Sequence, residues 1–371
     1  NTDSQRLEFF AQDRWYEMAT DSPLLAESGL GDVSLGARGI FGTGTTPGTT
    51  DFIGFINIAS NGNEQDFGDA FTEDQGASAG LSSRTRGIFA GGQDPSSPHN
   101  EIQFLTIAQK GDTTDFGDLS QSRRGVASSG SRTRGLFMSG AGPVPRSNVI
   151  DYITIATIGD ALDFGDLDSA QALESVSNQT RAFALGGDTP AIQNQMQFVT
   201  IASTGDMVDA GDLTTQTAEA DTYGSPTRGF VATLGSPANK KIDFFNFAST
   251  GNAQEFGELL VVASSGTGFS NGIRGIVAGG SPHLADIQAV NMVTLGDAAN
   301  FGDLTAGRSM LGGTSDCIRG VMIGGYISPG ANTAAIDYIN IATFGNAADF
   351  GDQATTARNA DATSSGHGGL G

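Results

Sequence analysis

The stretch RGLFMSG (residues 134–140), followed after a short loop by VIDYITIATIGDALDFGDL (residues 149–167), is one copy of a unit that recurs along most of the chain. The copies are spaced about 45 to 48 residues apart, which is the length of a four-stranded propeller blade and exceeds that of a leucine-rich repeat. The arginine that opens each copy stands at Arg38, Arg86, Arg134, Arg181, Arg228, Arg274 and Arg319. Seven copies predict seven blades.

The apolar runs of the unit predict strands that are buried on both faces. In residues 134–138 and 149–155, Ile, Leu, Phe and Tyr dominate and do not alternate cleanly with polar residues. Such strands suit the middle of a propeller blade, which is sandwiched between its two neighbours. A Gly-Asp or Gly-Asn pair then precedes the acidic D-F-G-D-L element and predicts a hairpin between the third and fourth strands. The sequence thus predicts an all-β fold, a seven-bladed β-propeller with four-stranded blades.

Two segments lie outside this regular pattern. Residues 1–28 lack glycine and are rich in aromatic residues, and we expect a short helix or strand that either docks onto another subunit or covers one face of the propeller. Residues 29–371 form the propeller, which must close on itself to avoid exposed strand edges. Either residues 353–366 or LGDVSL (residues 30–35) can supply the first strand of the blade that contains Arg38.

Composition narrows the possible partners and cofactors. The 41 acidic and 19 basic residues leave a net charge of -22, which opposes binding to nucleic acid or to an anionic membrane. No apolar run approaches the roughly 20 residues that span a bilayer. The single cysteine, Cys317, excludes an internal disulfide and is expected to be a buried small side chain. His99, His283 and His367 lack any metal-ligand spacing, so we predict no metal site and no cofactor.

Glycine pairs at the end of the second predicted strand resemble the diglycine of kelch repeats. These pairs are Gly91-Gly92, Gly186-Gly187, Gly279-Gly280 and Gly324-Gly325. The tyrosine and tryptophan of kelch units are reduced here to Tyr152 and Tyr338, because Trp15 lies outside the repeats. RGIFAGG (residues 86–92) and IDYITIATIGDALDFGDL (residues 150–167) are also similar to tandem repeats of tail-fibre-like proteins of marine phages, especially cyanophages. This resemblance covers about residues 36–371 and implies a virion component.

Acidic pairs flank the Phe-Gly or Ala-Gly of six units, and the seventh unit keeps Asn300 and Asp303. The pairs are Asp66/Asp69, Asp115/Asp118, Asp163/Asp166, Asp209/Asp212, Glu255/Glu258 and Asp349/Asp352. A catalytic pair needs two different environments at one place, so this repetition favours turn capping and blade-to-blade pairing, with calcium binding as the alternative. We predict no catalytic residue. The hypothesis pairs the repeated arginines Arg86, Arg134, Arg181, Arg228, Arg274 and Arg319 with acids such as Asp118, Asp166, Asp212 and Asp303.

The segment after the second strand is the part that differs most between units. Each of the seven contains proline, which stiffens a loop and lowers the entropy lost on binding. In a propeller these loops emerge on one face, where rigid scaffolds carry recognition. The candidate ligand-binding residues on them are His99, Arg146, Lys240, His283 and Tyr326. The alternative is that the loops are plain solvated connections.

These patterns, together with the resemblance, predict a structural and adhesive protein rather than an enzyme. The expected role is a virion component of a phage tail or fibre, homo-oligomeric in the particle. It would bind a host surface glycan or protein, or another virion protein, through the variable loops. One alternative is a propeller glycan hydrolase or lyase that acts on the host envelope. The other is a non-viral, extracellular interaction module of the kelch type.

Overall fold

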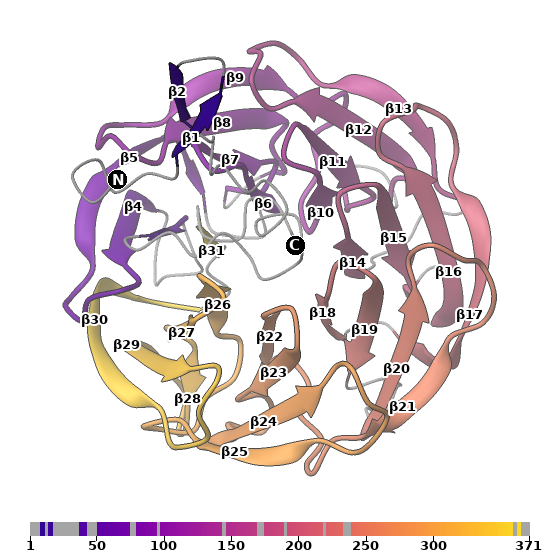
Figure 1. Ribbon diagram of the computed structural model, residues 1–371. Helices are drawn as coiled ribbons and strands as arrows, with labels where there is room; N and C mark the ends of the chain where they lie inside the picture. The colour runs from indigo at the N-terminus through magenta and orange to yellow at the C-terminus, as the bar shows by residue number, and fades with distance from the viewer. Residues whose placement is uncertain are drawn as a thin grey trace.

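The structure, a computed structural model, is a ring of seven antiparallel blades (Figure 1). It describes residues 8–11, 14–17, 37–42, 50–74, 79–94, 97–142, 146–168, 174–188, 191–217, 220–232, 239–358 and 362–364. These residues form strands, turns and loops, with no helix among them. The prediction of an all-β, seven-bladed propeller with four-stranded blades is confirmed.

Each blade runs from a first strand at the centre of the ring to a fourth strand at its rim (Figure 1). The first strands of blades 1 to 7 are β31 (Ala362–Ser364), β6 (Ala79–Ser82), β10 (Ala127–Gly130), β14 (Glu174–Ser177), β18 (Asp221–Gly224), β22 (Thr267–Ser270) and β26 (Gly312–Ser315). The second strands all begin at the repeated arginine and are β3 (Arg38–Phe41), β7 (Arg86–Ala90), β11 (Arg134–Met138), β15 (Arg181–Leu185), β19 (Arg228–Ala232), β23 (Arg274–Ala278) and β27 (Arg319–Ile323).

The two outer strands of each blade come from the I-D-Y-I and D-F-G-D parts of the unit. The third strands are β4 (Thr50–Asn57), β8 (Glu101–Thr106), β12 (Val149–Thr154), β16 (Gln193–Thr200), β20 (Lys241–Asn246), β24 (Asp286–Asn291) and β29 (Ala331–Asn340). The fourth strands are β5 (Gln65–Asp74), β9 (Thr114–Asp118), β13 (Leu162–Asp166), β17 (Val208–Thr217), β21 (Gln254–Glu258), β25 (Ala299–Asp303) and β30 (Ala348–Ala357). Third and fourth strands pair directly, as the glycine-led turns predict.

The ring is closed by a strand from the end of the chain. β31 pairs antiparallel with β3, with Gly39 opposite Ser364 and Phe41 opposite Ala362, so it fills the first-strand position of blade 1. The sequence offered residues 353–366 and LGDVSL as alternatives for this position. The strand lies within residues 353–366, and LGDVSL lies outside the described residues. Closure leaves the two innermost neighbours, β26 and β6, in contact with β31 rather than with solvent.

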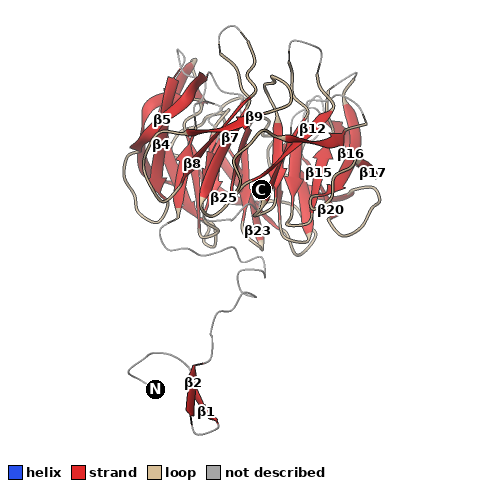
Figure 2. Ribbon diagram, turned by 90° about the horizontal axis from the view of Figure 1, so that it is seen from above, coloured by secondary structure: helices blue, strands red, loops and turns tan. Residues whose placement is uncertain are grey.

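Two short hairpins accompany the seven blades. In blade 7, β28 (Tyr326–Ile327) pairs with the beginning of β29. Near the start of the chain, β1 (Glu8–Ala11) pairs with β2 (Arg14–Glu17), and Figure 2 shows this pair apart from the ring. The expected helix or strand in residues 1–28 is thus a strand pair in the part of this segment that the structure describes.

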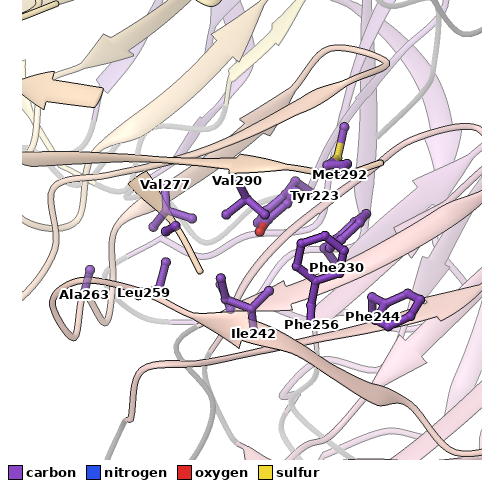
Figure 3. Packing of buried hydrophobic residues seen from close by; sticks show 12 residues of the cluster. Tyr223, Phe230, Ile242, Phe244, Phe256, Leu259, Ala263, Val277, Val290 and Met292 are labelled. Carbon is purple, nitrogen blue, oxygen red and sulfur yellow. The ribbon is translucent and has the colours of Figure 1, made fainter. Parts of the chain in front are cut away.

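Apolar cores lie between neighbouring blades. In Figure 3, Tyr223, Phe230 and Phe256 of blade 5 pack toward Val290 and Met292 of blade 6, and all five side chains are buried. The rings of Phe230 and Phe256 meet edge to face with centroids 5.1 Å apart. Because the apolar side chains of the second and third strands are shared by two blade junctions, these strands show no simple alternation in sequence.

At the rim, glycine is required by the close approach of two backbones. Gly117 in the D-F-G-D element of blade 2 has φ +139°, and a Cβ on it would lie 2.5 Å from the carbonyl carbon of Gly159. Gly159 is the turn glycine of blade 3, whose N–H donates to the Phe116 carbonyl at 2.8 Å. Each fourth strand is therefore clasped by the turn of the following blade.

Candidate functional site

The two faces of the ring are formed by different connections between strands. Because successive strands run in opposite directions, the variable segments between second and third strands share one face with the connections from one blade to the next; we call it the loop face. The turns between first and second strands and between third and fourth strands share the other, the turn face. The predicted ligand-binding residues belong to the loop face.

Two of the five predicted loop residues, His283 of blade 6 and Tyr326 of blade 7, lie together. Their ring centroids are 5.6 Å apart, and His283 Nδ1 is 2.9 Å from the Tyr326 carbonyl oxygen. A carbonyl only accepts, so Nδ1 carries the proton and Nε2 is the ring nitrogen left for a ligand. The Ser309 hydroxyl is 3.4 Å from the same Nδ1, and the Arg358 guanidinium lies 5.0 Å from the Tyr326 ring centre. We call these four residues the His283–Tyr326 cluster.

The local backbone explains why the two rings meet. His283 has a left-handed φ of +80°, and its N–H donates to the Gly280 carbonyl at 2.8 Å, which turns the loop back over the blade. Tyr326 exchanges backbone hydrogen bonds with Ser309, its N–H donating at 2.7 Å and its carbonyl accepting at 3.0 Å. Two loops from neighbouring blades are thus fixed against the same connection. All four cluster side chains retain at most partial exposure.

The other three predicted loop residues are dispersed. Arg146 of blade 3 forms an ion pair of 2.8 Å with Asp188 of blade 4, so its charge is engaged. The Lys240 ammonium donates to the Leu260 carbonyl of its own blade. His99 is largely buried, 14% exposed at the base of its loop, with Nδ1 3.5 Å from Glu101. The structure therefore brings together His283 and Tyr326 and not His99, Arg146 or Lys240.

The predicted pairing of repeated arginines with acids is wrong. In each of the seven blades, arginine Nη1 donates to a backbone carbonyl just after the third strand of the following blade. Arg134, for example, donates to the Ile201 carbonyl at 2.7 Å and lies 4.5 Å from the centre of the Tyr152 ring. A carbonyl just after the end of a strand has no partner in the strand ladder, so it is available to accept from the arginine. The acceptors are Ile107, Ile155, Ile201, Phe247, Met292, Ile341 and Ile58.

The repeated acids serve the rim clasp instead. Asp115 and its equivalents Asp163, Asp209 and Asp349 accept a hydrogen bond from the glycine N–H two residues later, which caps the turn. The N–H of the second acid, such as Asp118, donates to the turn side chain of the next blade, here Asp160 Oδ1 at 3.1 Å. This bond recurs at Asp69, Asp166, Asp212, Glu258, Asp303 and Asp352.

Two buried ion pairs were missed because they do not repeat in every unit. Arg123, fully buried, pairs with Asp151 and also donates from Nη1 to the Ser139 and Val149 carbonyls at 2.8 Å. Arg308 pairs with Asp337 at 3.0 Å in the same position of blade 7. Burial lowers the pKa of both guanidinium groups from their ordinary value. The sequence does contain a signal for these pairs. Both units have an arginine four residues before the first strand and an aspartate in the third strand.

A cavity of about 230 Å³ lies on the axis of the ring, lined by the first strands of all seven blades and the turns after them. Its polar groups are hydroxyls and backbone atoms, and its described lining residues include no Asp, Glu, His, Lys or Arg. Several of the hydroxyls bond to the preceding blade: Ser128 to the Gly80 carbonyl at 2.8 Å and Ser177 to the Gly130 carbonyl at 3.0 Å. These side chains join blades.

Cys317 lies on this cavity in a left-handed turn with φ +69°. Burial, with a contribution from Asp316, raises the pKa of its thiol to about 11, so it is a neutral thiol at physiological pH. Cys317 is half-buried, which is a little more exposure than the sequence predicts. Within the described ranges, no three His, Cys, Asp or Glu side chains gather in a way that could hold a metal ion. The same part of the chain offers no helix of membrane-spanning length and hydropathy.

Comparison with known proteins supports the fold. The chain matches no protein-family model and no curated protein. Among solved structures, it is similar to one described as the structure of YjhT, with a TM-score of 0.58 and 12% sequence identity. That match covers 74% of this chain and 97% of the other. At this identity the similarity concerns the propeller architecture alone.

Proposed function

We propose that this protein is a non-enzymatic binding module that uses the loop face of its propeller to hold a surface glycan. The His283–Tyr326 cluster carries the proposal. Two variable loops bring an imidazole and an aromatic ring together there, and the connection after β30 adds the guanidinium of Arg358. An aromatic ring offers a flat apolar surface to a sugar, and a guanidinium binds carboxylate or phosphate groups in a fork. The ligand that fits this chemistry is a sugar bearing a negative charge.

The positions of the carboxyl and hydroxyl groups on the ring support a binding function rather than hydrolysis. A glycosidase needs two carboxyl groups at one place in different environments. The repeated acids among the described residues are instead spread around the rim, where they cap turns and join blades. The described lining of the axial cavity carries hydroxyls that are bonded to neighbouring blades.

The setting that we propose is the virion, as a homo-oligomeric component of a phage tail or fibre that contacts a host surface glycan or other virion proteins. The support is the resemblance of the repeats over about residues 36–371 to tail-fibre-like proteins. Mass spectrometry of purified phage particles tests the setting, and absence of the chain from the particles would overturn it. The binding proposal can be tested separately on the isolated protein.

A glycan array with the full chain tests the binding site. We expect binding to charged glycans, reduced at least tenfold by Tyr326→Ala and by Arg358→Ala. The matched control is Thr204→Ala, an exposed residue on the turn face of blade 4, which should bind as the parent does. Equal binding by all four proteins would place the ligand elsewhere, and no binding to any glycan would reject the glycan class.

A further inference from the structure

The turn face carries an exposed group of large apolar side chains on blades 6 and 7. Its members, which we call the apolar patch, are Ile273, Val293, Leu295, Ile318 and Phe344. Their exposed fractions run from 39% for Ile318 to 65% for Leu295. Exposed apolar groups of this kind mark interaction surfaces when they are contiguous.

The patch does not follow from the repeat itself. The residue before the repeated arginine is threonine in blades 2 to 5, whereas blades 6 and 7 have Ile273 and Ile318. The residue before the turn glycine is Asn61, Lys110, Thr204 or Thr250 in four blades, whereas blades 6 and 7 have Leu295 and Phe344. The remaining blade, blade 3, has Ile158 at that position. Blades 6 and 7, which are neighbours, thus both carry apolar residues at two surface positions that are polar in most other blades.

Backbone and ring contacts place the members of the patch around the junction of blades 6 and 7. The Ile273 carbonyl accepts from Met292 N–H at 2.8 Å, which sets Ile273 beside Val293. Arg274, the next residue, crosses to blade 7 and lies 4.6 Å from the centre of the Phe344 ring. In blade 7, the Ile318 carbonyl accepts from Ile341 N–H at 2.8 Å. The members of the patch therefore lie on both sides of the junction of the two blades, which Arg274 bridges.

The chain also has an apolar element that needs a surface. In the β1–β2 hairpin, Phe9 is opposite Tyr16 and Phe10 is opposite Trp15. The short hairpin thus pairs aromatic residues with one another at two successive positions of its register. A lone two-stranded hairpin is marginally stable in water and gains stability by packing on a further element.

The hairpin is tethered to the same face as the patch. The Ala37 carbonyl accepts from Ile58 N–H at 2.9 Å, as those of Ile273 and Ile318 do in their blades, so the chain enters blade 1 on the turn face. Blade 1 is the neighbour of blade 7. Figure 2 shows β1 and β2 apart from their own ring, and this separation favours docking on a second copy.

We infer that the β1–β2 hairpin of one chain docks on the apolar patch of a second copy of this chain. Exchange in both directions closes a dimer through the two turn faces and leaves both loop faces directed outward. Each copy has a net charge of -22, so the contact is apolar in nature and association strengthens as salt screens the repulsion. The inference does not depend on the ligand of the loop face.

The single tryptophan of the chain, Trp15, lies in the hairpin and reports docking directly. We expect its fluorescence emission in the full-length protein to move to shorter wavelength as protein concentration rises, in step with a doubling of mass by light scattering. Leu295→Asp and Val293→Ser should each weaken dimerisation at least tenfold. The matched control is Ile158→Asp, which changes an exposed apolar residue (55% against 65% for Leu295) at the equivalent position of blade 3.

Each other result overturns the inference. A blue-shifted emission that is independent of concentration in a monomer would mean that the hairpin packs on its own ring. Dimers that form equally well in the Leu295 variant would place the contact elsewhere. Solvent-exposed Trp15 in a monomer at all concentrations would exclude docking. Thermal unfolding of every variant checks that the ring is intact.

Discussion

The carboxylate of Glu64 occupies the space that the absent side chain of Gly54 leaves open. A Cβ on Gly54 would lie 1.8 Å from Glu64 Oε1, and Glu64 Oε2 accepts a hydrogen bond from Ala354 N–H at 2.8 Å. In the other six blades, the third-strand residue equivalent to Gly54 provides this acceptor for the preceding blade. Those residues are Gln103, Asp151, Gln197, Asp243, Gln288 and Asp337.

Glu64, in the turn after the third strand, therefore provides the hydrogen-bond acceptor that Gly54, in the strand, lacks. This replacement of a strand acceptor by Glu64 occurs at the junction of blades 7 and 1, where β31 closes the ring on β3. It also puts a half-buried acid at a place where the other turns have Thr113, Ala161, Met207, Ala253, Ala298 or Ala347. This junction is the one we expect to depend on pH.

The first prediction concerns that pH dependence. Burial raises the pKa of Glu64 from 4.5 to about 7, against the hydrogen bond from Ala354, which lowers it. A carboxyl whose pKa is raised by folding favours the folded state in its protonated form. The free energy of unfolding should then fall by about 3 kcal/mol as the pH rises from about 4.5 to about 7.

Urea unfolding of the parent and of Glu64→Gln at about pH 5 and about pH 8 measures this contribution. The glutamine keeps an acceptor for Ala354 and does not titrate, so the variant should gain stability relative to the parent at the higher pH. Parallel pH profiles of the two proteins would contradict the assignment.

The second prediction is that Gly54 and Glu64 are coupled. Gly54→Gln alone should destabilise the ring by about 2 to 4 kcal/mol, because its side chain collides with Glu64 in a packed junction. Gly54→Gln combined with Glu64→Ala recreates the arrangement of the other blades and should recover most of the loss. A double-mutant cycle from thermal unfolding gives the coupling. Additive effects would mean that the two residues act independently.

The third prediction is that Arg134 stabilises the junction of blades 3 and 4 through a carbonyl. Arg134→Ala removes the bond to the Ile201 carbonyl and the contact with the Tyr152 ring, and should cost about 1 to 3 kcal/mol. Asp166→Asn is the matched control. It removes an exposed charge to which Arg134 does not bond, so the melting temperature should equal that of the parent within experimental error. An equal loss in both variants would favour the pairing of arginine with acid.

The fourth prediction concerns the buried Arg123–Asp151 pair. Arg123→Met leaves the Asp151 carboxylate buried without its cation and should cost about 3 to 5 kcal/mol. Replacing both residues, Arg123→Met with Asp151→Leu, removes the unpaired charge and should recover part of that loss. Denaturant unfolding measures both. A double variant less stable than Arg123→Met would show that the hydrogen bonds to blade 2 outweigh the cost of the charge.

The repeat made the architecture predictable, because a period of blade length and a fixed order of strand and turn signals are local properties. The second strands begin at the repeated arginine in all seven blades, and the glycine-led turns join the third and fourth strands as expected. The arginine partners were not predictable in the same way. A repeated arginine and a repeated acid are equally regular in sequence, and only the packing of one blade on the next decides that the arginine donates to a carbonyl.

The candidate site was likewise predictable only in the part that depends on local sequence. Variable, proline-bearing loops indicate a recognition face, but nothing local relates His283 to Tyr326, which are fixed by their shared contacts with Ser309. His99 is also a histidine on a proline-bearing loop, but its side chain is only 14% exposed and contacts Glu101.

By itself, the sequence determined the number of blades, the order of strands within them and the turns at the rim, since these depend on short-range backbone preferences and burial. The tertiary structure alone decided the partner of each repeated arginine, the exchange between Gly54 and Glu64, and the joining of two loops at His283 and Tyr326. Each of these depends on contacts between adjacent blades, whose residues lie tens to hundreds of positions apart in the chain.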